Sequence, residues 1–394
     1  MDKNNPNSPQ TTETAKASET AVTQELKDVQ GNTHQLTAEI ATDGQGKLHA
    51  TKNPDIIIRI VNIENSLKFN KNPAIMPYLA NVAGLALPLD NLETSMENPG
   101  YTIKIPNEFV PLTKLEGTLK RRLTILAELS KILIKLHSLP IIYGSMSPSR
   151  VFVSPNPKNT EVCLLHSAKM DFCMDFTEET DQDEYISPEA AAGKGATIAS
   201  DSYAFAKLAA DLLKDFAITP TLQDFLTSAL HDEPTKRPKM LAFYLAFMQE
   251  FDLLITCGKC HINFHYEIKK CPGCQATPPT MIKAFIYDKI GESEVPRGQK
   301  ILEFANTRQT FWNYHTNIVM LDDEIKAGID CTLNISADRK LRLIFKNLMD
   351  KEIQINNNAV APGAASMVAL PCELIRLTFK LYAITERYID MVVV

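Results

Sequence analysis

The sequence predicts an α+β protein in which a helical segment lies between two β-rich segments. Up to about residue 110, short apolar runs such as DIIIRIV and YTIKI alternate with Gly, Asn and Pro, which is the pattern of strands and turns. Leucines then recur at steps of three and four across 117–138, the period of a helix with one apolar face. From about residue 280 the strand pattern returns. A chain of 394 residues is long enough for two or three domains.

The domain boundaries follow from changes in composition and period. Residues 1–34 are rich in Thr, Asn, Ser, Gln and Glu, so they bury too little apolar surface to offset the entropy of ordering, and we expect a disordered tail. The other predicted units are a β-rich lobe at 35–110, a helical lobe at 111–254, a four-cysteine element at 255–278 and an all-β, sandwich-like domain at 279–394. Within the helical lobe, further helices are expected at 200–214, 221–230 and 239–254.

Charge and apolar content limit the classes of partner. The formal net charge of -6 lacks the basic footprint of most nucleic-acid binders, so nucleic acid is disfavoured. The N-terminal stretch has no apolar core of the signal-peptide kind, and no uninterrupted apolar run is long enough to cross a bilayer. We therefore expect a cytoplasmic protein with protein partners and no membrane association.

Two CxxC pairs form the strongest local chemical signal. Cys257 and Cys260 enclose Gly-Lys, Cys271 and Cys274 enclose Pro-Gly, and ten residues separate the pairs. Each pair makes a tight turn that aims two thiolates at one ion, and two such turns complete a tetrahedron around structural zinc. Redox chemistry of the thioredoxin type is the alternative. The other cysteines, expected in apolar cores, are Cys163, Cys173, Cys331 and Cys372.

The stretch YGSMSPSRVFVSP after the long helix resembles the catalytic loop and following strand of bacterial eukaryotic-like Ser/Thr protein kinases. Ser145 stands where that family has its catalytic Asp, and Arg150 stands where it has a metal-binding Asn. In EVCLLHSA, His166 occupies the place of the Asp of the DFG motif. The resemblance implies that the proton acceptor and both magnesium ligands are lost.

Other motifs of the family are kept. YISPEA, ASDSYAFAKLAADLL and HDEPTKRP resemble its APE segment, its following helix and its late Arg-Pro element. The resemblance implies that Glu189, Asp201 and Arg237 support the architecture, and that Glu189 and Arg237 form a buried ion pair. It thus implies a two-lobed protein-kinase-like fold without catalysis, which is a pseudokinase.

The N-terminal lobe matches the family more loosely. AEIATDGQGKLHAT resembles its glycine-rich loop and DIIIRIV resembles the strand of its phosphate-binding lysine, which Arg59 replaces; a simple hairpin turn is the alternative for the first segment. A displaced DFG at Asp171 is a second alternative. If a nucleotide site is retained, its residues are Gly44, Gly46, Arg59 and Asp171. Thr177, Thr180 and Tyr185, in the acidic segment that follows, are either phosphorylation sites or solvated hydroxyls.

Two further resemblances concern the C-terminal half. A kinase-like domain followed by a zinc ribbon resembles bacterial proteins of tellurite-resistance-type gene clusters, which implies a signalling or stress-response setting. EIQINNNAVAPG with MVALPCELIRLTF resembles the closing strands of forkhead-associated domains, which bind phosphothreonine. Asn356, Asn357 and Asn358 are then phosphopeptide contacts or, in the alternative reading, hairpin-turn residues.

Three functional hypotheses remain after these observations. The first is a catalytically inactive kinase-like scaffold or allosteric regulator with structural zinc, for which ATP and magnesium are doubtful cofactors. The second is an unorthodox ATP-dependent Ser/Thr kinase that uses Asp171 and Arg59. The third is a zinc-ribbon adaptor for nucleic acid, against which the acidic charge counts.

Overall fold

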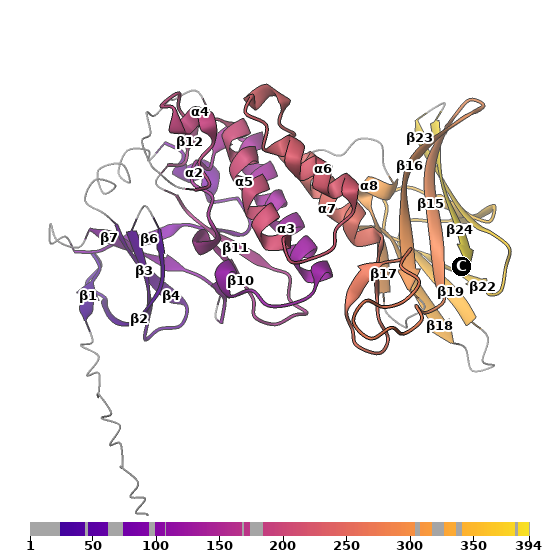
Figure 1. The fold of residues 1–394 in the computed structure, drawn as a ribbon, viewed down its shortest axis with the longest axis horizontal. Coiled ribbons are helices and arrows are strands. Elements are labelled where there is room, and N and C mark those ends of the chain that lie inside the picture. The colour runs from indigo at the N-terminus through magenta and orange to yellow at the C-terminus, as the bar shows by residue number, and fades with distance from the viewer. Residues whose placement is uncertain are drawn as a thin grey trace, which may run out of the picture.

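The computed structural model is a mixed α and β protein with more strand than helix. It describes residues 24–43, 46–61, 74–93, 99–106, 108–167, 169–173, 184–303, 308–316, 327–335, 341–382 and 385–393. A small N-terminal sheet, a helical body and a C-terminal pair of sheets follow one another along the length of the molecule (Figure 1). No helix within these described residues is long and apolar enough to span a membrane.

The N-terminal sheet is antiparallel throughout. Its strands, in spatial order, are β1 (Glu25–Lys27), β2 (Thr33–Asp43), β3 (Gly46–Thr51), β4 (Ile56–Val61), β7 (Gly100–Lys104) and β6 (Pro88–Asn91). The predicted disordered tail at 1–34 is too long, because strand β1 already begins at Glu25. The cause is Asp28, which is 1% exposed and accepts hydrogen bonds from the N–H groups of Gln30 and Asn32, so that it closes the turn between β1 and β2.

The helical body contains the predicted long helix and the three later ones. They are α3 (Leu119–Ser138), α5 (Ile198–Leu213), α6 (Pro220–Ala229) and α7 (Met240–Asp252). Thr118, Thr197 and Thr219 begin the first three of these helices, since each side chain accepts an N–H of the first turn. The positions of these helices confirm the periodicity read from the sequence to within three residues.

Short elements complete the helical body, and some of them form a second sheet beside the N-terminal sheet. A second sheet has the order β5 (Leu85–Ala86), β11 (Val162–Leu165), β10 (Val151–Val153) and β8 (Val110–Pro111). The other short elements are α2 (Met76–Leu79), η1 (Leu112–Lys114), β9 (Ile141–Ile142), η2 (Pro148–Arg150), β12 (Asp171–Phe172), α4 (Pro188–Ala191) and η3 (Pro234–Lys236). One apolar core joins α3, α5 and α7 with residues of this second sheet.

The C-terminal domain consists of two antiparallel sheets around one core. The first has the order β16 (Ser293–Glu303), β15 (Met281–Ile290), β24 (Thr385–Val393), β23 (Ile375–Tyr382), β20 (Ile353–Ile355) and β21 (Asn358–Val360). The second has the order β17 (Arg308–Trp312), β18 (Ala327–Ile335), β19 (Leu341–Asn347) and β22 (Ala365–Ala369), and α8 (Asn313–Thr316) follows β17. Ile286 and Phe379 of one sheet share a core with Phe345 of the other, which confirms the predicted sandwich.

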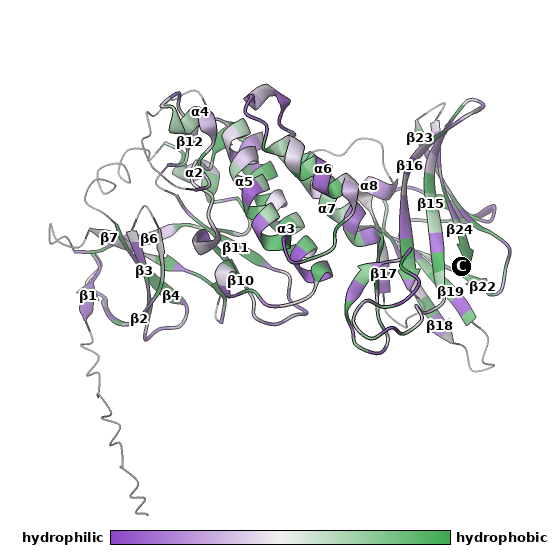
Figure 2. Ribbon diagram, viewed as in Figure 1, coloured by the Kyte–Doolittle hydropathy of each residue, from purple (hydrophilic) through white to green (hydrophobic). Residues whose placement is uncertain are grey.

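Hydropathy follows this packing. Figure 2 shows apolar residues along β15 and β24, whereas the outer strand β16 is mostly polar.

Asn356 and Asn357 have φ angles of 47° and 66° and join β20 to β21 in a two-residue hairpin turn, which supports their reading as turn residues. Of the scattered cysteines, Cys163 and Cys331 are buried as expected, while Cys173 and Cys372 are half-buried.

Candidate functional site

The four cysteines of the two CxxC pairs converge on one point. The hairpin of β13 (Leu254–Thr256) and β14 (Asn263–His265) carries the first pair, and the following loop carries the second. All four Sγ atoms lie within 4.8 Å of one another, with 3.5 Å between Cys257 and Cys274 and 3.4 Å between Cys260 and Cys271. This donor set fits a metal ion such as zinc.

The two cysteine loops have the same backbone geometry. In each loop the N–H of the first cysteine donates to the carbonyl five residues later, at 2.9 Å in the first loop and 2.8 Å in the second. The residue after each second cysteine is in the left-handed region, with φ of 60° at His261 and 59° at Gln275. Two equivalent turns of this kind bring two pairs of thiols to one centre from opposite sides.

Backbone dipoles favour the thiolate form at one of these ligands. The N–H groups of Cys260 and Lys259 lower the pKa of Cys257, and the N–H of Lys259 donates to its Sγ at 3.4 Å. Metal binding requires thiolates, so these dipoles assist it. Four sulfur donors leave no open coordination position, and the centre suits a structural role.

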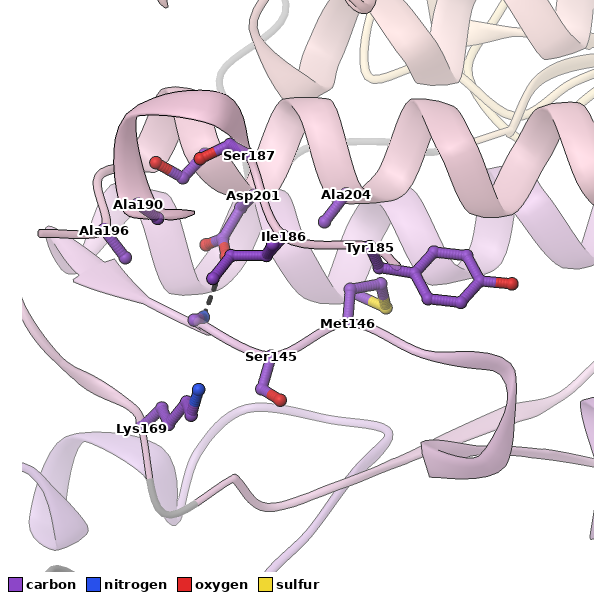
Figure 3. Close-up of a pocket in the computed structure, with 12 residues that line it drawn as sticks. Ser145, Met146, Lys169, Tyr185, Ile186, Ser187, Ala190, Ala196, Asp201 and Ala204 are labelled. Atoms are coloured by element: carbon purple, nitrogen blue, oxygen red, sulfur yellow. Dashed lines mark hydrogen bonds between the residues drawn. The ribbon is translucent and has the colours of Figure 1, made fainter. Parts of the chain in front are cut away.

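A second group of predicted residues surrounds the loop after β9. Asp201 of α5 fixes this loop, because its carboxylate accepts hydrogen bonds from the N–H of Tyr143 at 2.7 Å and of Gly144 at 2.8 Å. The dashed line in Figure 3 marks the second of these bonds. Gly144 has a φ of 76°, and an added Cβ there would lie 2.8 Å from the carbonyl oxygen of Lys169. Only glycine therefore fits between Asp201 and the segment of Lys169.

Ser145 lines a small cavity beside this loop. Figure 3 shows Ser145 and Lys169 along the lower side of the cavity, with Ser187 and Tyr185 above them. The cavity measures about 30 Å³, which is room for roughly two water molecules. Tyr185 is 6% exposed and donates to Asp211 at 2.9 Å, so its hydroxyl is not presented for phosphorylation. Thr177 and Thr180 lie outside the described residues.

Three basic residues lie close enough together to interact electrostatically. Arg59 of β4 and Arg150 of η2 are both fully buried, and His166, which follows β11, is 5% exposed. Burial, together with the charges of Arg150 and Arg59, lowers the pKa of His166 to about 3. His166 is therefore neutral near pH 7, and the two arginines supply fixed positive charge there.

Apolar side chains pack between the N-terminal sheet and the second sheet, and beside them lies a cleft of about 1000 Å³ that is lined by residues of β5, β6, β7 and β11. Leu48 of β3 and Ile57 of β4 belong to the same packed cluster as Phe152 of β10 and Leu165 of β11. Their exposed fractions are 0%, 2%, 0% and 0% respectively. The two sheets are thus joined by a continuous apolar core at this level, in which these four side chains are buried.

The ion pair predicted between Glu189 and Arg237 is present. Arg237 donates from Nη1 and Nη2 to the two carboxylate oxygens of Glu189, at 2.7 Å and 2.8 Å. Burial opposes ionisation of Glu189, but Arg237 and the hydroxyl of Ser200 outweigh it and lower the pKa of Glu189 to about 2. Arg237 also donates to main-chain carbonyls such as that of Ala199 at 3.0 Å, so it joins α4, α5 and η3.

The remaining predicted nucleotide residues have local structural roles. At Gly46, φ is 141° and an added Cβ would lie 2.0 Å from the carbonyl oxygen of Ile60, so glycine permits the approach of β3 to β4. Asp171 pairs with Ile142 across β12 and β9, and its Oδ1 accepts the N–H of Phe172 at 2.8 Å. Among the described residues, the only cluster of three or more possible metal ligands is that of the cysteines. Gly44 lies outside the described residues.

Sequence analysis did not identify a buried polar network at the end of α7. Asp252 is 2% exposed and accepts hydrogen bonds from Lys300 of β16 and from Tyr314 and His315 of α8. The N–H of Trp312 donates to Nδ1 of His315, so Nε2 carries the hydrogen that Asp252 accepts at 2.7 Å. A carboxylate at the end of an apolar helix is the one sequence signal that could have pointed to this network.

Lys120 joins the cysteine element to the helical body and to the C-terminal sandwich. It lies in α3, and its N–H donates to Asn263 of β14 at 3.2 Å. Its Nζ bonds to Thr256 of β13 and forms an ion pair with Glu303 of β16. The helical body, the cysteine element and the sandwich thus meet around one lysine.

A comparison with models of known protein families finds no match, and no curated protein matches the chain.

Proposed function

We propose that this protein is a catalytically inactive, protein-kinase-like scaffold or allosteric regulator that acts through protein contacts in bacterial signalling or stress response. The observation that carries the proposal is the apolar packing between the N-terminal sheet and the second sheet. In the kinase-like reading, a nucleotide would have to enter where Leu48, Phe152 and Leu165 are packed together without solvent contact.

The polar residues around this space support the same proposal. Ser145 at neutral pH is neither a base nor an anion, so it cannot accept a substrate proton as a carboxylate does. Arg150 and Arg59 bring positive charge to the place where the kinase-like reading would put magnesium, and neutral His166 offers no carboxylate ligand. Phosphoryl transfer depends on such electrostatic stabilisation.

We propose zinc as the ion of the four-cysteine centre, with a structural role. Bound zinc would cross-link the two cysteine loops and fix their hairpin. That hairpin is anchored through Asn263 and Thr256 to Lys120 of α3. The metal therefore stabilises the junction between the helical body and the sandwich.

A scaffold needs binding surfaces held in a fixed relation. The Asp252 network and the Lys120 junction tie α3 and α7 to β16 and α8 through buried hydrogen bonds and ion pairs. Such pairs are costly to break on one side only, so the sandwich keeps one orientation against the helical body. A fixed orientation suits a scaffold, which presents one surface of the helical body and one of the sandwich to its partners. An enzyme that opens and closes at a hinge would need the two parts to move.

Phosphoryl transfer from labelled ATP tests the proposal. Purified, zinc-loaded protein is incubated with magnesium and a general protein substrate, beside an Asp171→Asn variant. We expect no transfer above background from either protein. Magnesium-dependent transfer that Asp171→Asn abolishes would instead establish the unorthodox kinase.

A further inference from the structure

Each of the two cysteine loops has one buried thiol and one half-buried thiol. In the first loop Cys257 is buried and Cys260 is half-buried. In the second loop Cys271 is buried and Cys274 is half-buried. The sequence neighbours of both half-buried cysteines are exposed, and they are Lys259, His261, Gly273 and Gln275. A small oxidant in the solvent therefore has access to one thiol of each loop.

The close sulfur contacts run from one loop to the other. The Sγ of Cys257 lies 3.5 Å from that of Cys274, and the Sγ of Cys260 lies 3.4 Å from that of Cys271. Each contact thus joins a half-buried thiol of one loop to a buried thiol of the other. The sulfur atoms of a disulfide are about 2.05 Å apart, so each pair must close by about 1.4 Å, a movement that side-chain rotation supplies.

We propose that this centre is a site of oxidative modification, at which a peroxide converts the four zinc-bound thiolates into two disulfides and the metal is released. The disulfides join Cys257 to Cys274 and Cys260 to Cys271. The proposal rests on the structural zinc proposed above, because ligands of zinc are thiolates and the thiolate is the form of cysteine that attacks an oxidant. The half-buried thiolates react first, since their buried partners are shielded from solvent.

Each disulfide consumes one molecule of hydrogen peroxide. The thiolate of Cys260 attacks one peroxide oxygen, the O–O bond breaks, and a sulfenic acid and a hydroxide ion result. The thiolate of Cys271 then attacks the sulfenic sulfur, which forms the S–S bond and expels a second hydroxide. Cys274 and Cys257 react in the same way. The two sulfurs of each pair supply the two electrons that the peroxide takes up, and zinc leaves as the divalent ion because its thiolate ligands are consumed.

This modification acts at the junction of the helical body and the sandwich. Nζ of Lys120 in α3 bonds to Thr256, which directly precedes Cys257. Disulfides draw the two loops closer together than thiolates that share one ion, so the oxidised hairpin has a different geometry next to this anchor. The centre thereby makes the proposed scaffold responsive to peroxide.

Zinc release and disulfide mapping on the full chain test the proposal. Elemental analysis first establishes one zinc per chain. We expect excess hydrogen peroxide to transfer this zinc to a chromogenic chelator. After digestion with trypsin without reduction, the peptide that holds Cys271 and Cys274 should be linked to the peptides of Cys257 and Cys260. Cys372→Ser, at a half-buried cysteine outside the cluster, should lose its zinc as wild type does.

Cys274→His tests the pairing itself. The imidazole supplies a fourth zinc ligand, so the variant should still bind zinc, but one of the two disulfides is prevented. We expect peroxide to join Cys260 to Cys271 and to leave Cys257 without a disulfide. Trypsin cleaves after Lys259 and separates Cys257 from Cys260, so the two possible links to Cys271 give different peptides.

The outcomes separate this proposal from that of structural zinc. Protein that keeps its zinc and four reduced thiols in peroxide overturns the modification and leaves the structural metal in place. Disulfides within each CxxC motif, or a link from Cys257 to Cys271 in Cys274→His, overturn the pairing. Protein that holds no zinc before oxidation contradicts the proposed metal and with it this proposal.

Discussion

Arg237 and Glu189 form an ion pair with two parallel hydrogen bonds of 2.7 Å and 2.8 Å, in which the arginine side chain is fully buried. Replacing Glu189 with Gln leaves a buried guanidinium without its counter-charge. We expect a loss of about 3 kcal/mol in the free energy of unfolding. Denaturant titration measures it.

The matched control is Glu233→Gln. Glu233 pairs with Lys236 at 2.8 Å, but both side chains are more than half exposed. Solvent screens such pairs, so we expect no measurable loss of stability. Equal losses in Glu189→Gln and Glu233→Gln would contradict the structural importance of the buried pair.

His166 gives the folded protein a pH dependence of known sign. Its pKa is about 3 in the folded state against an ordinary value of 6.5, so between these pH values the unfolded chain binds more protons. Stability therefore falls as pH is lowered from about 6.5, with a slope of up to about 1.4 kcal/mol per pH unit from this group. His166→Gln should remove that part of the slope.

Denaturant midpoints between pH 5 and 6.5 measure this slope, because the depressed carboxylates titrate at lower pH. A constant loss of stability in His166→Gln does not affect the comparison, which concerns the slope alone. The exposed His231→Gln is the control and should keep the slope of wild type. An unchanged slope in His166→Gln would show that His166 is protonated in the folded state.

Zinc removal should destabilise the junction of the domains. We expect one zinc per chain by elemental analysis, and a lower melting temperature after chelation or in Cys271→Ser, because the bound metal stabilises only the folded hairpin. Cys372→Ser, at a half-buried cysteine far from the cluster in sequence, should retain the zinc. If zinc-free protein had the same melting temperature as zinc-loaded protein, the metal would not stabilise the junction.

Asp252 is expected to couple the unfolding of the helical body to that of the sandwich. Burial alone would raise its pKa, but Lys300 and His315 outweigh burial and hold the pKa at about 2. Asp252→Asn leaves Lys300 buried without its counter-charge, and we expect a loss of about 3 kcal/mol. Calorimetry should show one transition in wild type and two in the variant, with exposed Asp350→Asn as control. A single transition in both would contradict the coupling.

Local sequence patterns were sufficient to predict those parts of the structure in which residues close in sequence are also close in space. The leucine period predicted α3 because a helix repeats every 3.6 residues, and the two CxxC pairs predicted the sulfur cluster because each turn is closed by its own backbone. The ion pair of Glu189 and Arg237 could be predicted only from the resemblance to kinases, because 48 residues separate the two side chains in the sequence.

Long-range polar contacts could not be predicted in this way. Asp252 bonds to Lys300 and His315, which lie 48 and 63 residues further along the chain and belong to elements with no shared period. Strand β1 was missed for a different reason. Its three residues have no apolar alternation of their own, and the buried side chain of Asp28 orders the segment.

The central claim is that the packed side chains of Leu48, Phe152 and Leu165, between the N-terminal sheet and the second sheet, exclude nucleotide. A thermal-shift titration of zinc-loaded protein with ATP, with and without magnesium, tests it most directly, because a ligand that binds only the folded state raises the melting temperature. We predict no shift up to millimolar ATP in either condition. A magnesium-dependent rise would contradict the account and return Asp171 to consideration as a metal ligand.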